Sequence, residues 1–85
     1  HSAFFATTLD TLLRHMEVEE LVITGLTSHQ CVLFTAIDAY VRDLRLRVPA
    51  DCIAAARAAD TRLALRMLRS VLHADVGPST RIEFP

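Results

Sequence analysis

The sequence lacks lysine entirely, contains only two cysteines and has no long run of apolar residues. Its longest apolar runs fall far short of the ~20 residues that a membrane-spanning helix needs, so we expect no membrane segment. No basic region followed by an apolar core stands at the N-terminus, so we expect no signal peptide. The nine basic residues are all arginine and the net charge is −1, which gives no electrostatic case for a nucleic-acid partner. Cys31 and Cys52 are too few for a disulfide scaffold, and a reducing cytoplasm is the simplest setting.

The chain is short and rich in apolar residues. It has 85 residues, of which 52% are hydrophobic, and its mean hydropathy is +0.32. A single domain of this size buries only about 60–65% of the surface that its unfolded chain exposes. We therefore expect another chain, or sequence outside these residues, to cover part of the apolar surface.

The stretch Leu21–Val32 organises the rest of the sequence, because it predicts a strand, a tight turn and the start of a helix. Leu21–Thr24 is a continuous apolar run, typical of a strand buried on both faces of a parallel sheet. Gly25 permits a sharp exit from that strand. A thiol at the following helix start, Cys31, lies beside unpaired backbone N–H groups and the positive end of the helix dipole. Both features lower a thiol pKa and favour the thiolate.

Helical spacing predicts three helices. The first covers Thr8–Met16, the second runs from His29 or Gln30 to about Asp43, and the third is capped by Asp60 or Thr61. The expected buried stripes are Leu33, Ile37, Tyr40, Val41 and Leu44 on the second helix, and Leu63, Met67, Leu68, Val71 and Leu72 on the third.

Two further strands are predicted at Arg45–Pro49 and Ala74–Val76, while Cys52–Ala56 is interpreted as a loop or a short helical turn. The resulting order alternates helix and strand, with connections long enough for parallel pairing. The sequence therefore predicts an α/β fold with a parallel sheet and right-handed βαβ units.

Cys31 is the candidate reactive group, because it follows the C-terminal end of a predicted parallel strand, where open α/β sheets bind ligands. The alternative, a small apolar residue buried in the core, stays open. Cys52 follows no clear helix start and is expected to be a packing residue. His29 lies two residues from Cys31, and it either couples with the thiol or faces solvent and caps the helix.

We expect no metal site. His15 and His73 do not have metal-ligand spacing with either cysteine, and both suit the C-terminal ends of helices. Glu17, Glu19 and Glu20 are interpreted as a solvated acidic edge rather than as metal ligands.

The segment Gly25–Val32 resembles the nucleophile segment of the isochorismatase-like cysteine hydrolases, a superfamily that includes nicotinamidases, carbamoyl-amide hydrolases and isochorismatases. The similarity continues through Leu33–Tyr40 and Val48–Cys52, and upstream through Ser2–Leu9. It covers nearly the whole chain but only the C-terminal half of the family domain. The resemblance implies a three-layer α/β/α sandwich with a parallel sheet, the Rossmann-like isochorismatase fold. Residues 1–85 would then be the C-terminal part of such a hydrolase domain, with a partial set of its βαβ units.

The resemblance also implies site residues. The family triad consists of Asp, Lys and Cys, and only the cysteine carries over, onto Cys31. The sequence has no lysine, and no Asp lies in a segment that resembles the family's first strand. The family places a non-proline cis peptide before the nucleophile, which here would join Leu26 to Thr27. Its role would be to direct the backbone N–H groups of Thr27 and Cys31 at one point, as an oxyanion hole.

By resemblance, the function is hydrolysis of the C–N bond of a small amide through a thioester on Cys31, without a cofactor. We expect the site to be incomplete in this chain, and the 85 residues alone to be inactive. The alternative is a non-catalytic fragment or an assembly remnant of such a hydrolase. The expected partners are a small-molecule substrate and either the missing N-terminal half or further copies of the chain, as a homo-oligomer. The sequence does not identify the substrate.

Overall fold

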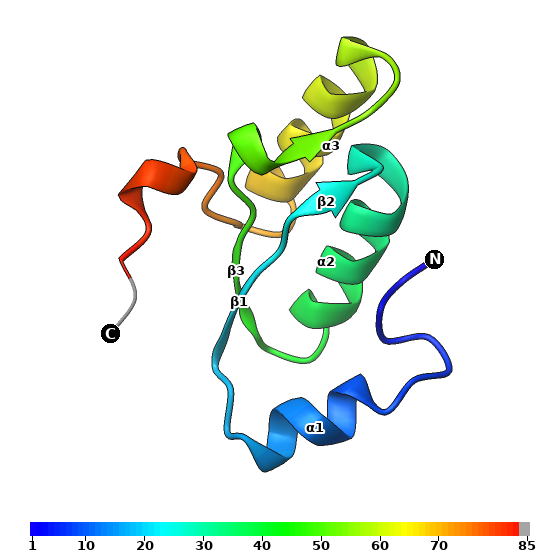
Figure 1. The fold of residues 1–85 in the computed structure, drawn as a ribbon, viewed down its shortest axis with the longest axis vertical. Helices are drawn as coiled ribbons and strands as arrows, with labels where there is room; N and C mark the ends of the chain where they lie inside the picture. The colour runs from blue at the N-terminus through cyan, green and yellow to red at the C-terminus, as the bar shows by residue number, and fades with distance from the viewer. Residues whose placement is uncertain (84–85) are drawn as a thin grey trace.

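The computed structural model describes residues 1–83, in which two pairs of parallel strands pack beside helices (Figure 1). Strand β1 (Glu20–Val22) pairs with β3 (Arg45–Arg47), and β2 (Gly25–Leu26) pairs with β4 (Ile53–Ala54). Both pairings are parallel, so the predicted α/β class and strand direction are confirmed. The predicted strand at 74–76 is reduced to one parallel bridge, at Asp75.

The described residues contain three α-helices: α1 (Leu9–His15) before β1, α2 (Leu33–Tyr40) between β2 and β3, and α3 (Ala58–Ser70) after β4. The predicted helix Thr8–Met16 is confirmed within one residue at each end. Helix α3 begins two residues before Asp60, the earlier of its two predicted caps. Before α2, residues Ser28–Val32 form a turn of π-helix, so the helical backbone begins slightly earlier than expected. Short 3-10 turns at 50–52 and 79–81 complete the described chain.

The region predicted as a loop or helical turn at 52–56 contains strand β4 instead. Two residues are too few to show an alternating pattern, and the strand exists because β2 lies beside it. None of the helices within residues 1–83 is long and apolar enough to cross a membrane.

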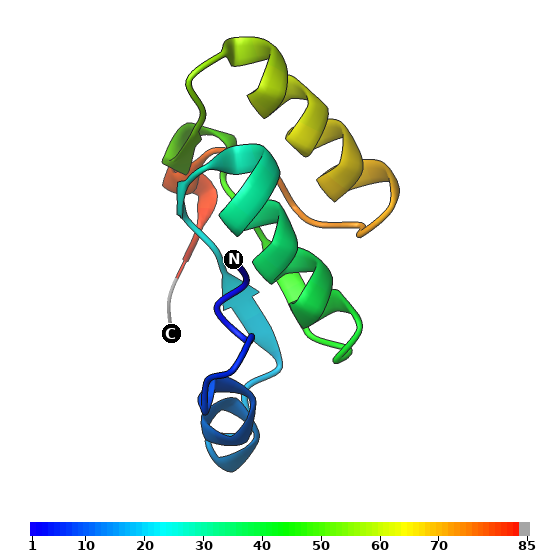
Figure 2. The same cartoon turned by 90° about the vertical axis from the view of Figure 1, so that its right-hand side faces the viewer.

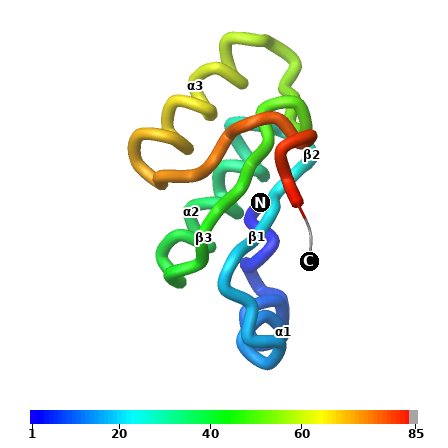
Figure 3. The backbone as a smooth tube through the Cα atoms, turned by 90° about the vertical axis from the view of Figure 1, so that its left-hand side faces the viewer, coloured from blue at the N-terminus to red at the C-terminus, as the bar shows by residue number. Residues whose placement is uncertain are grey.

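Helices α2 and α3 lie on the same side of the strands, as Figures 2 and 3 show from opposite directions. Leu21 and Ile23 are half-buried, whereas Val22 is exposed. The expectation that Leu21–Thr24 is buried on both faces is therefore wrong for this chain. A strand buries both faces only when a helical layer covers each of them, and α2 and α3 supply one layer.

The predicted helix stripes are also partly wrong. Helix α2 buries Ala36 and Ala39, while Ile37, Tyr40 and Val41 are exposed. Small side chains let the helix backbone approach the sheet closely, and hydrophobicity alone does not reveal this. Helix α3 likewise buries Ala64 and Leu68, whereas Leu63, Met67 and Val71 are exposed.

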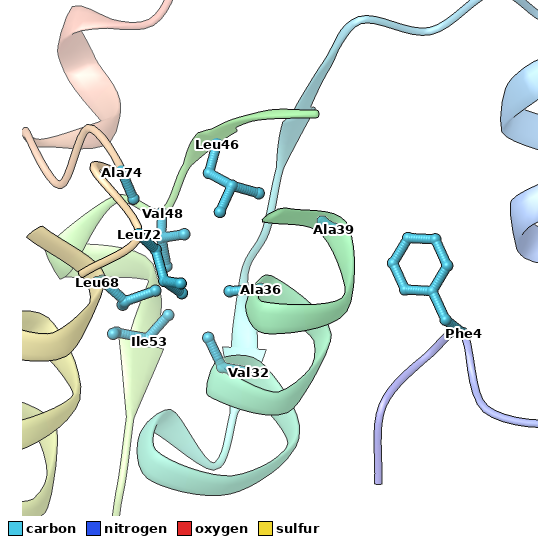
Figure 4. Packing of buried hydrophobic residues seen from close by; sticks show 10 residues of the cluster. All are labelled: Phe4, Val32, Ala36, Ala39, Leu46, Val48, Ile53, Leu68, Leu72 and Ala74. Atoms are coloured by element: carbon cyan, nitrogen blue, oxygen red, sulfur yellow. The ribbon is translucent and has the colours of Figure 1, made fainter. Parts of the chain in front are cut away.

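The core forms where α2 and α3 meet the strands (Figure 4). Leu68, Val48 and Ile53 pack together there, and Phe4 from the N-terminal segment lies on the other side of α2. The arginine side chain at position 42 covers the Phe4 ring, with its guanidinium carbon 4.5 Å from the ring centroid. The full cluster of buried residues is Phe4, Val32, Ala36, Ala39, Leu46, Val48, Ile53, Leu68, Leu72 and Ala74.

Candidate functional site

Cys31 lies in the sharp connection between β2 and α2. Gly25 has φ +120°, a conformation that other residues rarely adopt, which is why a glycine stands there. The peptide bond between Leu26 and Thr27 is cis, at the position that the resemblance implies. The Thr27 carbonyl then accepts hydrogen bonds from the N–H groups of Gln30, at 3.1 Å, and Val32, at 3.2 Å. The second of these bonds closes the π-helical turn that carries Cys31.

Hydrogen-bond donors surround the Cys31 sulfur, which is half-buried. The charged α-amino group of His1 donates a hydrogen bond to Sγ over 3.2 Å. Nearby, the Ala3 N–H donates to Thr35 Oγ1 at 2.9 Å and ties the N-terminal segment to α2. The His1 hydrogen bond is the main cause that lowers the pKa of Cys31 below its ordinary value. Partial burial opposes this effect, while the His1 charge and the backbone N–H groups of Thr27 and Cys31 lower the pKa further.

The sulfur opens into a cavity of about 460 Å³ between the N-terminal segment, β1 and the turn. Leu21, Ile23 and Leu26 supply apolar walls, and Thr35 and Cys31 supply polar atoms. This mixture of apolar walls and a few polar groups is typical of small-molecule sites.

A larger open groove of about 740 Å³ lies at the other end of the strands, near Tyr40 and His73, and does not include Cys31. Its arginines are already paired: Arg47 Nε lies 3.0 Å from Glu20 Oε1, and Arg45 Nε lies 3.7 Å from Glu20 Oε2. The cavity at Cys31 is therefore the better candidate site, although it is smaller.

The other residues considered from sequence lie apart from this cavity. His29 turns toward α3, where its Nε2 lies 3.9 Å from Asp60 Oδ2, so it does not couple with Cys31. Cys52 is a half-buried free thiol whose Sγ lies 3.9 Å from Asp51 Oδ1. Within the described residues 1–83, no group of three or more His, Cys, Asp or Glu side chains is placed to hold a metal ion.

Two contacts around the Cys31 turn have no signal in the sequence pattern. One is the approach of the His1 amino group to the sulfur, across 30 residues of sequence. The other joins Ser28 Oγ to Thr61 Oγ1 at 3.0 Å, across 33 residues. Hydrophobic periodicity and capping rules describe local structure, so they do not predict such long-range polar contacts.

Comparisons with known proteins agree with this geometry. A family model described as the isochorismatase domain matches residues 1–79. An uncharacterised isochorismatase family protein of Bacillus subtilis is 44% identical over 82 residues, which are 96% of this chain and 45% of that protein. The crystal structure of the nicotinamidase of Staphylococcus aureus superposes with a TM-score of 0.86 and 36% identity, covering 88% of this chain and 49% of that one. The N-carbamoylsarcosine amidase of Thermoplasma acidophilum gives a TM-score of 0.85 and 34% identity, covering 98% and 46%. The chain thus spans slightly less than half the length of each of these relatives.

Proposed function

This chain belongs to the isochorismatase family, and we propose that it is part of a cysteine-dependent hydrolase that cleaves the C–N bond of a small amide. Two similar proteins of known structure are a nicotinamidase and an N-carbamoylsarcosine amidase, both of which are named for amide substrates. One observation links the proposal to a particular residue: the Cys31 sulfur lies at a cavity and accepts hydrogen bonds from the His1 nitrogen and from backbone N–H groups.

In this proposal the Cys31 thiolate attacks the carbonyl carbon of the amide, and the carbonyl oxygen gains negative charge. The backbone N–H groups of Thr27 and Cys31 stabilise that charge as an oxyanion hole. The C–N bond then breaks, and a thioester remains on the sulfur. The nitrogen leaves as ammonia or an amine with the proton that the thiol lost, which in the family passes through the triad Asp that no segment of this chain supplies. Water attacks the thioester, the acid is released and the thiol is restored.

The chain supplies the nucleophile and the oxyanion donors of this scheme, but it has no lysine for the cationic role that the family assigns to that residue. Residues 1–85 are proposed to be the C-terminal part of a hydrolase domain. The two free cysteines suit a reducing compartment such as the cytoplasm.

The proposal includes association with an N-terminal half or with further copies of this chain. Exposed apolar side chains support it on α2 and α3 and directly after them: Ile37 on α2, Leu63 on α3, and the residues that follow the two helices, Val41 and Val71. Leu26, beside the nucleophile turn, is 71% exposed. The second candidate function is a non-catalytic fragment or assembly remnant of such a hydrolase.

An activated ester tests the nucleophile without requiring the complete triad. The chain is incubated with p-nitrophenyl acetate, whose leaving group departs without a proton, and the acetylated residues are mapped by mass spectrometry. Only acetyl groups on cysteine sulfur are counted, because amino groups also react directly with the ester. We expect acetylation that is lost in Cys31→Ser and retained in the matched variant Cys52→Ser.

The same variants are then assayed for ammonia release from nicotinamide and related small amides. Residues 1–85 alone are expected to release no ammonia above background, and turnover that is lost in Cys31→Ser would mean that the catalytic partners of the thiol lie within this chain. In a protein extended by an N-terminal half, turnover that depends on Cys31 would support the hydrolase function, whereas acylation without turnover would favour the non-catalytic alternative. Equal acetylation of Cys31 and Cys52 in folded protein would refute the assignment of Cys31 as the nucleophile.

A further inference from the structure

The nucleophile turn Ser28–Val32 contacts the N-terminus of α3 through two polar side chains. Ser28 is fully buried, and its hydroxyl lies 3.0 Å from Thr61 Oγ1. The adjacent His29 places Nε2 3.9 Å from Asp60 Oδ2. Two successive residues of the turn therefore meet two successive residues of α3.

The Ser28 hydroxyl needs a hydrogen-bond partner within the protein, because the residue is fully buried and no solvent reaches it. A buried hydroxyl without a partner costs more than its hydrogen bond contributes, so the turn is held where Thr61 can satisfy it. The carboxylate of Asp60 is itself positioned by Arg57, whose Nε donates a hydrogen bond to Oδ2 at 3.2 Å. The pairing of β2 with β4 brings the chain segments before the turn and before α3 side by side.

The position of this turn controls the surroundings of the Cys31 sulfur. Ser28 is bonded directly to Thr27, whose backbone N–H faces Sγ, and Cys31 lies three residues further along the same turn. A change in the shape of this turn would move the Thr27 N–H relative to the Cys31 sulfur.

We propose that Ser28 and Thr61 are positioning residues, whose hydroxyl pair holds the turn so that the N–H groups of Thr27 and Cys31 stay directed at the Cys31 sulfur. This inference deepens the proposed function and depends on it for its catalytic meaning. Neither hydroxyl is proposed to touch the substrate, and both act through the backbone that carries Cys31.

Thr61→Val tests the pair, because it replaces the hydroxyl by a methyl group of similar size. The readout is the pH dependence of Cys31 alkylation by iodoacetamide, followed by peptide mass spectrometry with Cys52 as an internal reference. We expect the apparent pKa of Cys31 to rise in Thr61→Val and its rate at neutral pH to fall about two- to tenfold, as for one lost hydrogen bond. Thr61→Ser keeps a hydroxyl and should retain most of the wild-type rate. Thr11→Val, at an exposed position of α1, is the matched control and should change neither value.

A purely structural role for the pair would lower the melting temperature of Thr61→Val without changing the Cys31 profile, and that result would overturn the inference. If Thr61→Val does not fold, the double variant Ser28→Ala/Thr61→Val leaves no unpaired buried hydroxyl and is judged by the same profile. Failure of the proposed function can be told apart from failure of this inference, because it appears as absent acetylation of Cys31 in the wild-type chain. The alkylation profile reports the positioning in either case.

Discussion

Truncation of Leu68 tests the core that holds the site together. Its side chain is 0% exposed and packs with Val48, Ile53 and Leu72 between α3 and the strands (Figure 4). Replacing a fully buried leucine by alanine costs about 2–5 kcal/mol, because apolar contact is lost and a cavity remains. We expect about 3 kcal/mol, a large share of the ~5–15 kcal/mol that stabilises a typical domain. In a domain of this size each kcal/mol lowers Tm by about 4–8 °C, so Tm should fall by roughly 12–24 °C.

Leu63→Ala is the matched control on the same helix. Its side chain is 50% exposed, so the truncation removes far less buried surface and should cost about 1 kcal/mol or less. Urea unfolding followed by circular dichroism measures both variants, and the free energies are compared when the slope m is unchanged.

One result would refute this reasoning, and a second would support the proposed association. A cost below about 0.5 kcal/mol for Leu68→Ala, the range of ordinary surface changes, would mean that Leu68 is not in the core. Equal costs for Leu63→Ala and Leu68→Ala would mean that the exposed face of α3 is covered. Repeating the measurement at several protein concentrations would then show whether another copy covers it, because association makes stability depend on concentration.

Three further predictions concern the thiols, the C-terminal segment and assembly. Cys31 should react with iodoacetamide faster than Cys52 at neutral pH, and equal rates for the two thiols in folded protein would refute the activation argument. Asp51 accepts hydrogen bonds from the Ser79 N–H, at 2.8 Å, and from the Ser79 hydroxyl, at 2.6 Å; the side-chain bond is the main cause that lowers the pKa of Asp51. Because the folded pKa is depressed, this stability is fully present above the unfolded pKa of about 3.9 and is lost as the pH falls through the folded pKa. Asp51→Asn should therefore lower Tm at pH 7 and lose that difference in acid, and a difference that persists unchanged in acid would contradict the carboxylate's role. Sedimentation equilibrium at micromolar concentration should show a species larger than 9.4 kDa, whereas a cooperatively melting monomer that binds no apolar dye would contradict the proposed association.

Local patterns in the sequence were sufficient for the parts of the fold that depend on neighbours in the chain. The apolar run at 21–24, the glycine after it and the helical spacing that follows predict the strand, the turn and α2 in the right order. The same reasoning places Cys31 at the start of that helix, and the strand directions follow from the length of the connections between strands.

Only the tertiary structure decided which faces are buried and which side chains meet at the site. The buried face of α2 is set by Ala36 and Ala39, because close approach to the sheet favours small side chains over the more hydrophobic Ile37. The hydroxyl contact of Ser28 with Thr61 joins residues far apart in the sequence. Periodicity shows which surfaces a segment could bury, but packing against the other segments selects among them, and those contacts surround the Cys31 turn.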